Sequence, residues 1–175
     1  MANCRSQIPE YIEPDCSLES GRVVALSFIH KDIHAAIYAD PSIAGNWVDG
    51  AYASDLFVFQ EVRGSFDGGS PVDVPGVGNQ DVRTINVDRS MTITIPGVKG
   101  NEGFWDEMVK TGNYRVAAVV GGAYDLLFIN NVDTSIVAVP VVEEGLDSAV
   151  NWTVTIKWKD IKNMRTSSVP VGIFN

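Results

Sequence analysis

The sequence predicts a mainly β fold, an antiparallel β-sandwich or barrel with one short helix packed on it. Apolar and polar residues alternate over residues 150–159, which is the period-two pattern of a strand with one buried face. Residues 116–120 and 126–129 are instead almost continuously apolar, as in strands that are covered on both faces. A one-sided strand beside two-sided strands implies a layered or closed β-core.

Residues 1–20 read as an extended N-terminal arm, because they hold two prolines and four acids but only scattered apolar residues. Ile8, Tyr11 and Ile12 give this arm side chains that can dock on a neighbouring subunit. Cys4 and Cys16 are the only cysteines. A bridge between them would stabilise the fold by about 3 kcal/mol, whereas a reducing compartment favours free thiols, so both states stay open.

Residues 21–160 form a single predicted β domain. A strand is expected over 21–30, with 35–39 as its hairpin partner, and 41–47 form at most a helical turn. Strands over 56–66 and 82–95 can pair as a long hairpin. Between them, residues 67–81 hold four glycines and two prolines and are expected to form a structureless loop at its tip, of the kind that is usually functional or disordered.

The predicted helix covers about residues 102–110, with Asn101 as its cap and Gly112 as its stop. Its apolar stripe would press on the sheet and plug one open side of the β-core. After residue 160 the chain leaves the sheet as a C-terminal tail, 161–175, which ends in an apolar segment.

Length and charge limit the possible functions. A chain of 175 residues fits one domain that buries about 70% of its unfolded surface. The formal net charge of −9 argues against a groove that grips nucleic acid through its phosphates. The N-terminus lacks the apolar core of a secretory signal, and no stretch reaches the length of a membrane span, so we expect a protein made in a cytoplasm without a membrane partner.

The residues with metal or catalytic potential do not form a recognisable site. His30 and His34 have the spacing of a helical zinc pair, but eleven residues separate Cys4 from Cys16, unlike the cysteines of a zinc finger. The sequence contains neither a nucleophile elbow nor a phosphate loop. We therefore expect no catalytic, cofactor-binding or metal-binding residues, and no enzyme.

The charged residues are unevenly distributed along the chain. Between Arg115 and Lys157 the sequence has five acids and no Lys or Arg, whereas Lys157, Lys159, Lys162 and Arg165 then follow closely. This pattern fits ordinary surface scatter. It equally fits a self-complementary protein in which the basic end of one copy meets the acidic edge of the next.

The segments EVRGSFDGGSPVDVPGVGNQDVRT, GFWDEMVKTGNYRVAAVVGGAYDLLFI and VNWTVTIKWKD, with a terminal PVGIF, resemble virion structural proteins of tailed phages that infect Bacteroidetes, including crAss-like phages. The resemblance covers most of residues 8–175 and is one of overall pattern. The order of elements is also similar to that of tail-tube and tail-hub proteins. This resemblance implies a non-enzymatic protomer that forms rings around a channel, through which genomic DNA passes without specific binding.

The resemblance places the subunit contacts in the arm, the 67–81 loop and the tail, and the charge pattern adds two lysines. The expected interface residues are Ile8, Tyr11, Ile12, Asp67, Pro71, Val74, Pro75, Val77, Asp81, Lys157, Lys159, Ile173 and Phe174. The expected partners are copies of the chain and other virion proteins of the tail or neck, in a particle assembled in the host cytoplasm. A capsid decoration or head–tail connector protein is the alternative, and a carbohydrate-binding β-sandwich that uses Trp47, Tyr52 and Tyr124 is a third.

Overall fold

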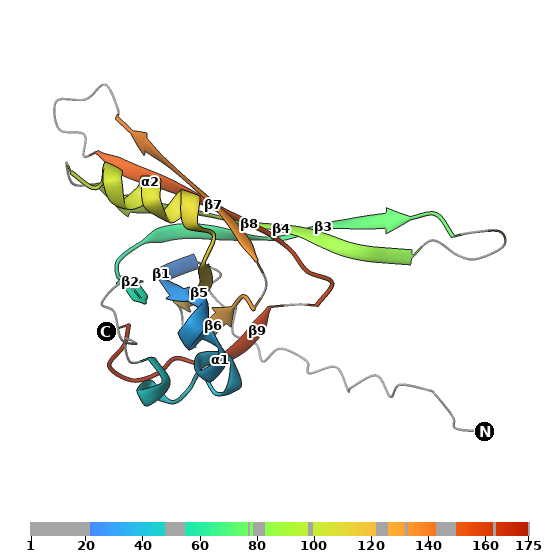
Figure 1. Cartoon of the computed structure of the whole chain (residues 1–175), viewed down its shortest axis with the longest axis horizontal. Helices are drawn as coiled ribbons and strands as arrows, with labels where there is room; N and C mark the ends of the chain where they lie inside the picture. Colours follow the sequence, from blue (N-terminus) through green and yellow to red (C-terminus); the bar gives the residue numbers. More distant parts are fainter. Residues whose placement is uncertain are drawn as a thin grey trace, which may run out of the picture.

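The protein is mainly β, as the sequence predicts, and the nine strands of the described residues form one antiparallel sheet in a computed structural model of the chain (Figure 1). The structure describes residues 22–47, 55–76, 78, 83–97, 100–121, 126–131, 133–142, 150–162 and 164–174. The strands are β1 (Arg22–His30), β2 (Leu56–Phe59), β3 (Arg63–Val74), β4 (Arg83–Pro96), β5 (Tyr114–Gly121), β6 (Leu126–Ile129), β7 (Thr134–Val141), β8 (Asn151–Lys159) and β9 (Arg165–Ser168). The helices are α1 (Lys31–Ala39), the short 3-10 helix η1 (Ala44–Trp47) and α2 (Glu102–Thr111).

The strand order is β7-β8-β4-β3-β1-β5-β6-β9, with β2 pairing with β1 outside this path. The sheet bends where β1 meets β3, and this junction holds one register pair, Val23 with Gly64. A Cβ atom on Gly64 would lie 2.9 Å from the carbonyl oxygen of Thr92 and 2.8 Å from the Ile93 side chain, so β3 can approach β4 there because the residue is glycine. All the described strands belong to one connected sheet, and its further description as a sandwich or a barrel stays a prediction.

The main core lies between the two arms of the bent sheet. One arm contributes apolar side chains of β4, β7 and β8, the other contributes those of β1 and β5, and α2 adds Trp105 and Met108. In β8 the buried positions alternate as predicted, so that Trp152 and Trp158 point to the same face. The predicted helix is confirmed, and it ends at Gly112 in the left-handed conformation with a φ of 57°.

A second core covers the opposite face of β1, β5 and β6. Ile37 of α1, Trp47 of η1 and Phe174 near the C-terminus pack there against Ala117, Val119, Leu127 and other apolar side chains of these strands. Strands β1 and β5 are therefore buried on both faces, which confirms the prediction from the continuous apolar run in β5.

The prediction of a strand over residues 35–39 was wrong, because these residues lie in α1. The His30 side chain accepts a hydrogen bond from the backbone N–H of Asp32, 3.3 Å away, and so caps the first turn. Ile33 and Ile37 are four residues apart and pack on the second core. A short apolar run fits either a strand or one face of a helix. Here the run is helical, and the helix places Ile33 and Ile37 on the second core.

The prediction of a loop over residues 67–81 was wrong for its first half, because Asp67–Val74 belong to β3. The glycines there form a β-bulge between Asp67 and Ser70. Gly69 has a φ of 95°, and a Cβ atom on it would lie 2.3 Å from the carbonyl oxygen of Asp88. The expected hairpin forms between β3 and β4, whereas β2 separates from β3 at Glu61, whose φ is 59°, and pairs with β1.

The C-terminal tail is part of the body of the protein. Strand β9 pairs with β6, and the Arg165 guanidinium donates hydrogen bonds to the carbonyl oxygens of Tyr38 and Ala39 at the end of α1. The Phe174 ring is 8% exposed and lies 5.2 Å from the Trp47 ring, measured between centroids. Phe174 therefore packs on its own chain, and its expected place at a subunit interface stays a prediction.

We expect Val154→Ala to lower the free energy of unfolding by about 2 kcal/mol, because the Val154 side chain is fully buried in the main core. Val139→Ala on β7 is the matched control, because Val139 is 52% exposed, and its effect should stay within about 0.5 kcal/mol. Urea unfolding followed by tryptophan fluorescence measures both, at a protein concentration where the chain is monomeric. Equal losses in the two variants would contradict the assignment of faces.

We expect Phe174→Ala to destabilise the protein by about 3 kcal/mol, because it leaves a cavity beside Trp47. Val171→Ala, at a position that is 84% exposed, should change the stability little. The same urea titration applies at a protein concentration where the chain is monomeric. A tail that docks only on another subunit would leave the monomer's stability unchanged in both variants.

Candidate functional site

The candidate functional site is an interaction surface that begins with the outer part of the β3–β4 hairpin. Beyond the bulge, five residue pairs from Ser70↔Asp88 to Val74↔Arg83 continue the hairpin away from the body, a length of about 17 Å (Figure 1). Asp160 still pairs with β4 at Val87, through backbone hydrogen bonds of 3.1 and 3.2 Å. Past that point the hairpin has two strands in the part of the chain that the structure describes. We call its outer part, residues 70–74 and 83–88, the projection.

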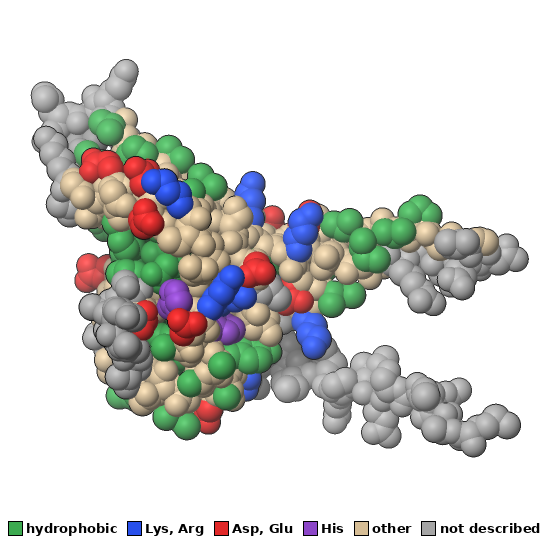
Figure 2. All heavy atoms as spheres, viewed as in Figure 1, with side chains coloured by type: hydrophobic (Ala, Val, Ile, Leu, Met, Phe, Trp, Pro, Cys, Tyr) green, Lys and Arg blue, Asp and Glu red, His purple; other side chains and the backbone are tan. Residues whose placement is uncertain are grey.

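The projection presents apolar side chains to solvent. Val74 is 43% exposed and Ile85 is 52% exposed. Ile85 occupies the second irregularity of the hairpin, because Val72 pairs with Asn86 and Asp73 pairs with Thr84, which leaves Ile85 without a partner in the register. Figure 2 shows hydrophobic side chains at the surface along this hairpin.

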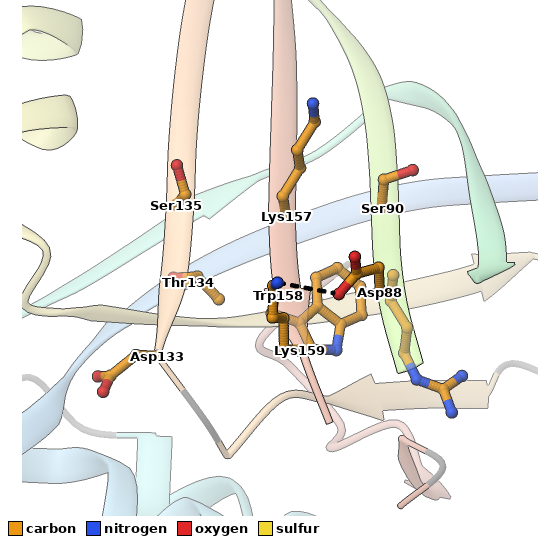
Figure 3. Close-up of a pocket in the computed structure, with 9 residues that line it drawn as sticks. Asp88, Ser90, Asp133, Thr134, Ser135, Lys157, Trp158 and Lys159 are labelled. Carbon is orange, nitrogen blue, oxygen red and sulfur yellow. Dashed lines mark ion pairs between the residues drawn. The ribbon is translucent and has the colours of Figure 1, made fainter. Parts of the chain in front are cut away.

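A polar hollow of about 770 Å³ lies at the root of the hairpin, where β4, β8 and β7 run side by side (Figure 3). It is lined by Asp88, Arg89, Ser90, Asp133, Thr134, Ser135, Lys157, Trp158 and Lys159. The register places Ser135 opposite Lys157 and Lys157 opposite Ser90, so these three side chains form one row across the outer face of the sheet.

Most charges around the hollow are paired within the chain. Lys159 lies 3.4 Å from the carboxylate of Asp88. Asp133 accepts a 2.5 Å hydrogen bond from Arg115 and lies 3.1 Å from Lys31, and these cations hold the pKa of its carboxyl below the usual value. The nine lining residues include three hydroxyl side chains, Ser90, Thr134 and Ser135, and no histidine or cysteine.

The structure brings only some of the expected interface residues together. Pro71, Val74 and Pro75 are exposed on or beside the projection, and Asp67 accepts a hydrogen bond from the backbone N–H of Gly69 and so supports the bulge. Lys157 and Lys159 are exposed at the end of β8, and Ile173 is partly buried beside Phe174 in the second core. Ile8, Tyr11, Ile12, Val77 and Asp81 lie outside the described residues.

The two histidines have structural roles. His30 caps α1, and the Nε2 atom of His34 lies 3.1 Å from the carbonyl oxygen of Asn130 at the end of β6. Among the described residues, no group of three or more His, Cys, Asp or Glu side chains could hold a metal ion. Cys4 and Cys16 lie outside these residues.

The suggested carbohydrate-binding aromatic set is not supported at Trp47. Its side chain is 2% exposed, and its indole N–H donates a 3.0 Å hydrogen bond to the carbonyl oxygen of Pro41. Trp47 is therefore a core residue, and the interpretation of it as an exposed binding aromatic was wrong. Tyr52 and Tyr124 lie outside the described residues.

Sequence reasoning missed one surface, the outer face of β7. Val137, Val139 and Val141 point outward from this strand with exposed fractions of 48%, 52% and 38%, whereas Ile136 is buried. The signal was present in the sequence, because a run of apolar residues without alternation makes both faces of a strand apolar. The sequence does not show whether another layer covers each face, and the exposed fractions of the three valines show that one face of β7 is open.

No helix within the described ranges is long and apolar enough to cross a membrane. Comparison with protein-family models, with curated proteins and with solved structures finds no match to this chain.

We expect the stability of the protein to fall as the pH drops below about 6.5, the usual pKa of histidine. Burial of His34 lowers its pKa, and Arg115 lowers it further against the opposing hydrogen bond to Asn130. The unfolded chain therefore binds a proton at a higher pH than the folded chain does, and this favours unfolding. His34→Gln, which keeps a side-chain N–H donor, should flatten this decline in urea titrations between pH 5 and 7.5, and an unchanged decline would contradict the assignment.

Proposed function

We propose that the protein is a non-enzymatic structural subunit that assembles with copies of itself, as part of a tailed-phage particle. Its proposed place is the tail tube or tail hub, where copies form a ring around the DNA channel. The observation that carries the self-assembly is the two-stranded projection with Val74 and Ile85 in solvent. The specific assignment to a phage tail rests on the resemblance of the sequence.

The projection is difficult to explain in a chain that works alone. A two-stranded hairpin is at best marginally stable in water and gains order when a third strand or another surface covers it. The bulge at Gly69 instead directs this hairpin away from both cores of its own chain. Burial of Val74 and Ile85 against another molecule would supply the missing stabilisation.

The overall charge supports a position beside DNA without binding to it. A net charge of −9 repels a phosphate backbone, so an acidic channel wall would let DNA slide. The paired cations at Asp88 and Asp133 leave few positive groups at the polar hollow for a polyanion to bind.

We expect the purified protein to form rings or tubes in negative-stain electron micrographs and to elute as oligomers in size-exclusion chromatography with light scattering. A variant in which Asn-Gly replaces residues 73–85 joins Val72 to Asn86, which are register partners, through a two-residue turn. This variant should be monomeric with an unchanged circular dichroism spectrum.

If the shortened variant assembles as the full chain does, the hairpin is not part of the subunit contact. A full-length chain that stays monomeric and binds only preformed heads would support the decoration or connector alternative instead.

A further inference from the structure

The outer face of β7 forms a stripe of exposed valines at one end of the sheet. Val137, Val139 and Val141 occupy successive outward positions, and Val142 directly after them is 75% exposed. The opposite face of this strand packs on the main core through Ile136 and Ala138. We name Val137, Val139, Val141 and Val142 the valine stripe.

The backbone beside the valine stripe has an edge without a strand partner in the described part of the chain, although α2 lies close to β7. Among the described strands, β7 pairs with β8 alone, so its other edge presents backbone donors and acceptors that no ladder uses. Natural edge strands commonly carry charged residues that prevent further pairing. The sequence of β7, TSIVAVPV, contains no charge, and Pro140 is its only residue that cannot donate a backbone hydrogen bond.

The hairpin projection has the matching properties. It carries Val74 and Ile85 in solvent, on the two strands that leave the body. Asp73 is exposed as well, but it precedes Val74 directly in β3 and therefore points to the opposite face of the hairpin. The contact we consider is therefore apolar: burial of Val74 and Ile85 on the exposed valines of a second copy would remove both surfaces from water.

The projection and the valine stripe of one chain do not face each other. The hairpin leaves the body on one side, whereas β7 runs toward the opposite side (Figure 1). Each copy therefore carries both halves of a contact that only two copies can complete. A contact between two different surfaces is heterologous, and its repetition produces a ring or an open filament.

We propose that the β3–β4 hairpin of one copy binds the valine stripe and the free edge of β7 on a second copy. This inference rests on the proposed function and assigns the partner surface of the hairpin. It places Ile85 and Val74 of one protomer against Val137, Val139 and Val141 of the next.

The experiment uses two full-length variants, each with one damaged surface. Ile85→Lys damages the hairpin and Val139→Lys damages the stripe, and both side chains are 52% exposed, so neither change disturbs a core. Each variant alone should be monomeric in light scattering at concentrations where the unmodified chain forms oligomers. Mixed in equal amounts, they should form heterodimers and nothing larger, because the pair retains one intact hairpin and one intact stripe that can meet.

Two control variants add lysine to exposed apolar positions elsewhere. Ile43→Lys, where the side chain is 50% exposed, matches Ile85→Lys, and Val109→Lys on α2, where it is 45% exposed, matches Val139→Lys. Both should assemble as the unmodified chain does.

The outcomes separate this inference from the proposed function. If the unmodified chain assembles and Val139→Lys assembles equally well, the stripe is not the partner surface, although self-assembly stands. If both variants are monomeric and their mixture is monomeric too, the two surfaces do not meet each other, and the inference is overturned. If the unmodified chain never oligomerises, both proposals fail.

Discussion

The architecture depends on the burial of β1 and β5 on both faces. The seven residues of β5 other than Arg115 are all apolar or glycine, and each face of such a strand must be covered. One face is covered by the main core, to which β4, β7, β8 and α2 contribute. The other face is covered by the second core, to which α1, η1 and Phe174 near the C-terminus contribute. These elements thereby belong to the body of the protein.

The bulge at Gly68 and Gly69 separates this body from the hairpin projection. The backbone of Gly69 fits closely against Asp88, Asp67 accepts its N–H, and the Arg89 guanidinium donates a 2.8 Å hydrogen bond to the carbonyl oxygen of Gly68. Each of these contacts fixes the direction in which the strands continue. The glycines thus give the hairpin a defined exit from the body and keep β3 and β4 paired beyond it.

Local patterns predicted the elements whose neighbours are close in sequence. The alternation of apolar and polar residues predicted strand β8, and Gly112 predicted the end of α2. Both signals depend on backbone and side-chain chemistry within one element. The glycines of residues 68–69 suggested a loop because a bulge needs the same residue type as a turn. The burial of Phe174 depends on Trp47, more than a hundred residues away in sequence, and no local pattern contains that contact.

The two ends of the sheet differ in a way that bears on assembly. Strand β9 ends the sheet with Arg165, Thr166, Ser167 and Ser168, a short polar edge that water can solvate and that discourages further pairing. Strand β7 ends it with eight uncharged residues and an outer face of valines. Exposure of such an edge favours uncontrolled association unless a specific partner covers it. The hairpin projection is the described element of the chain that itself needs a surface, so its pairing with β7 would satisfy both requirements in one contact.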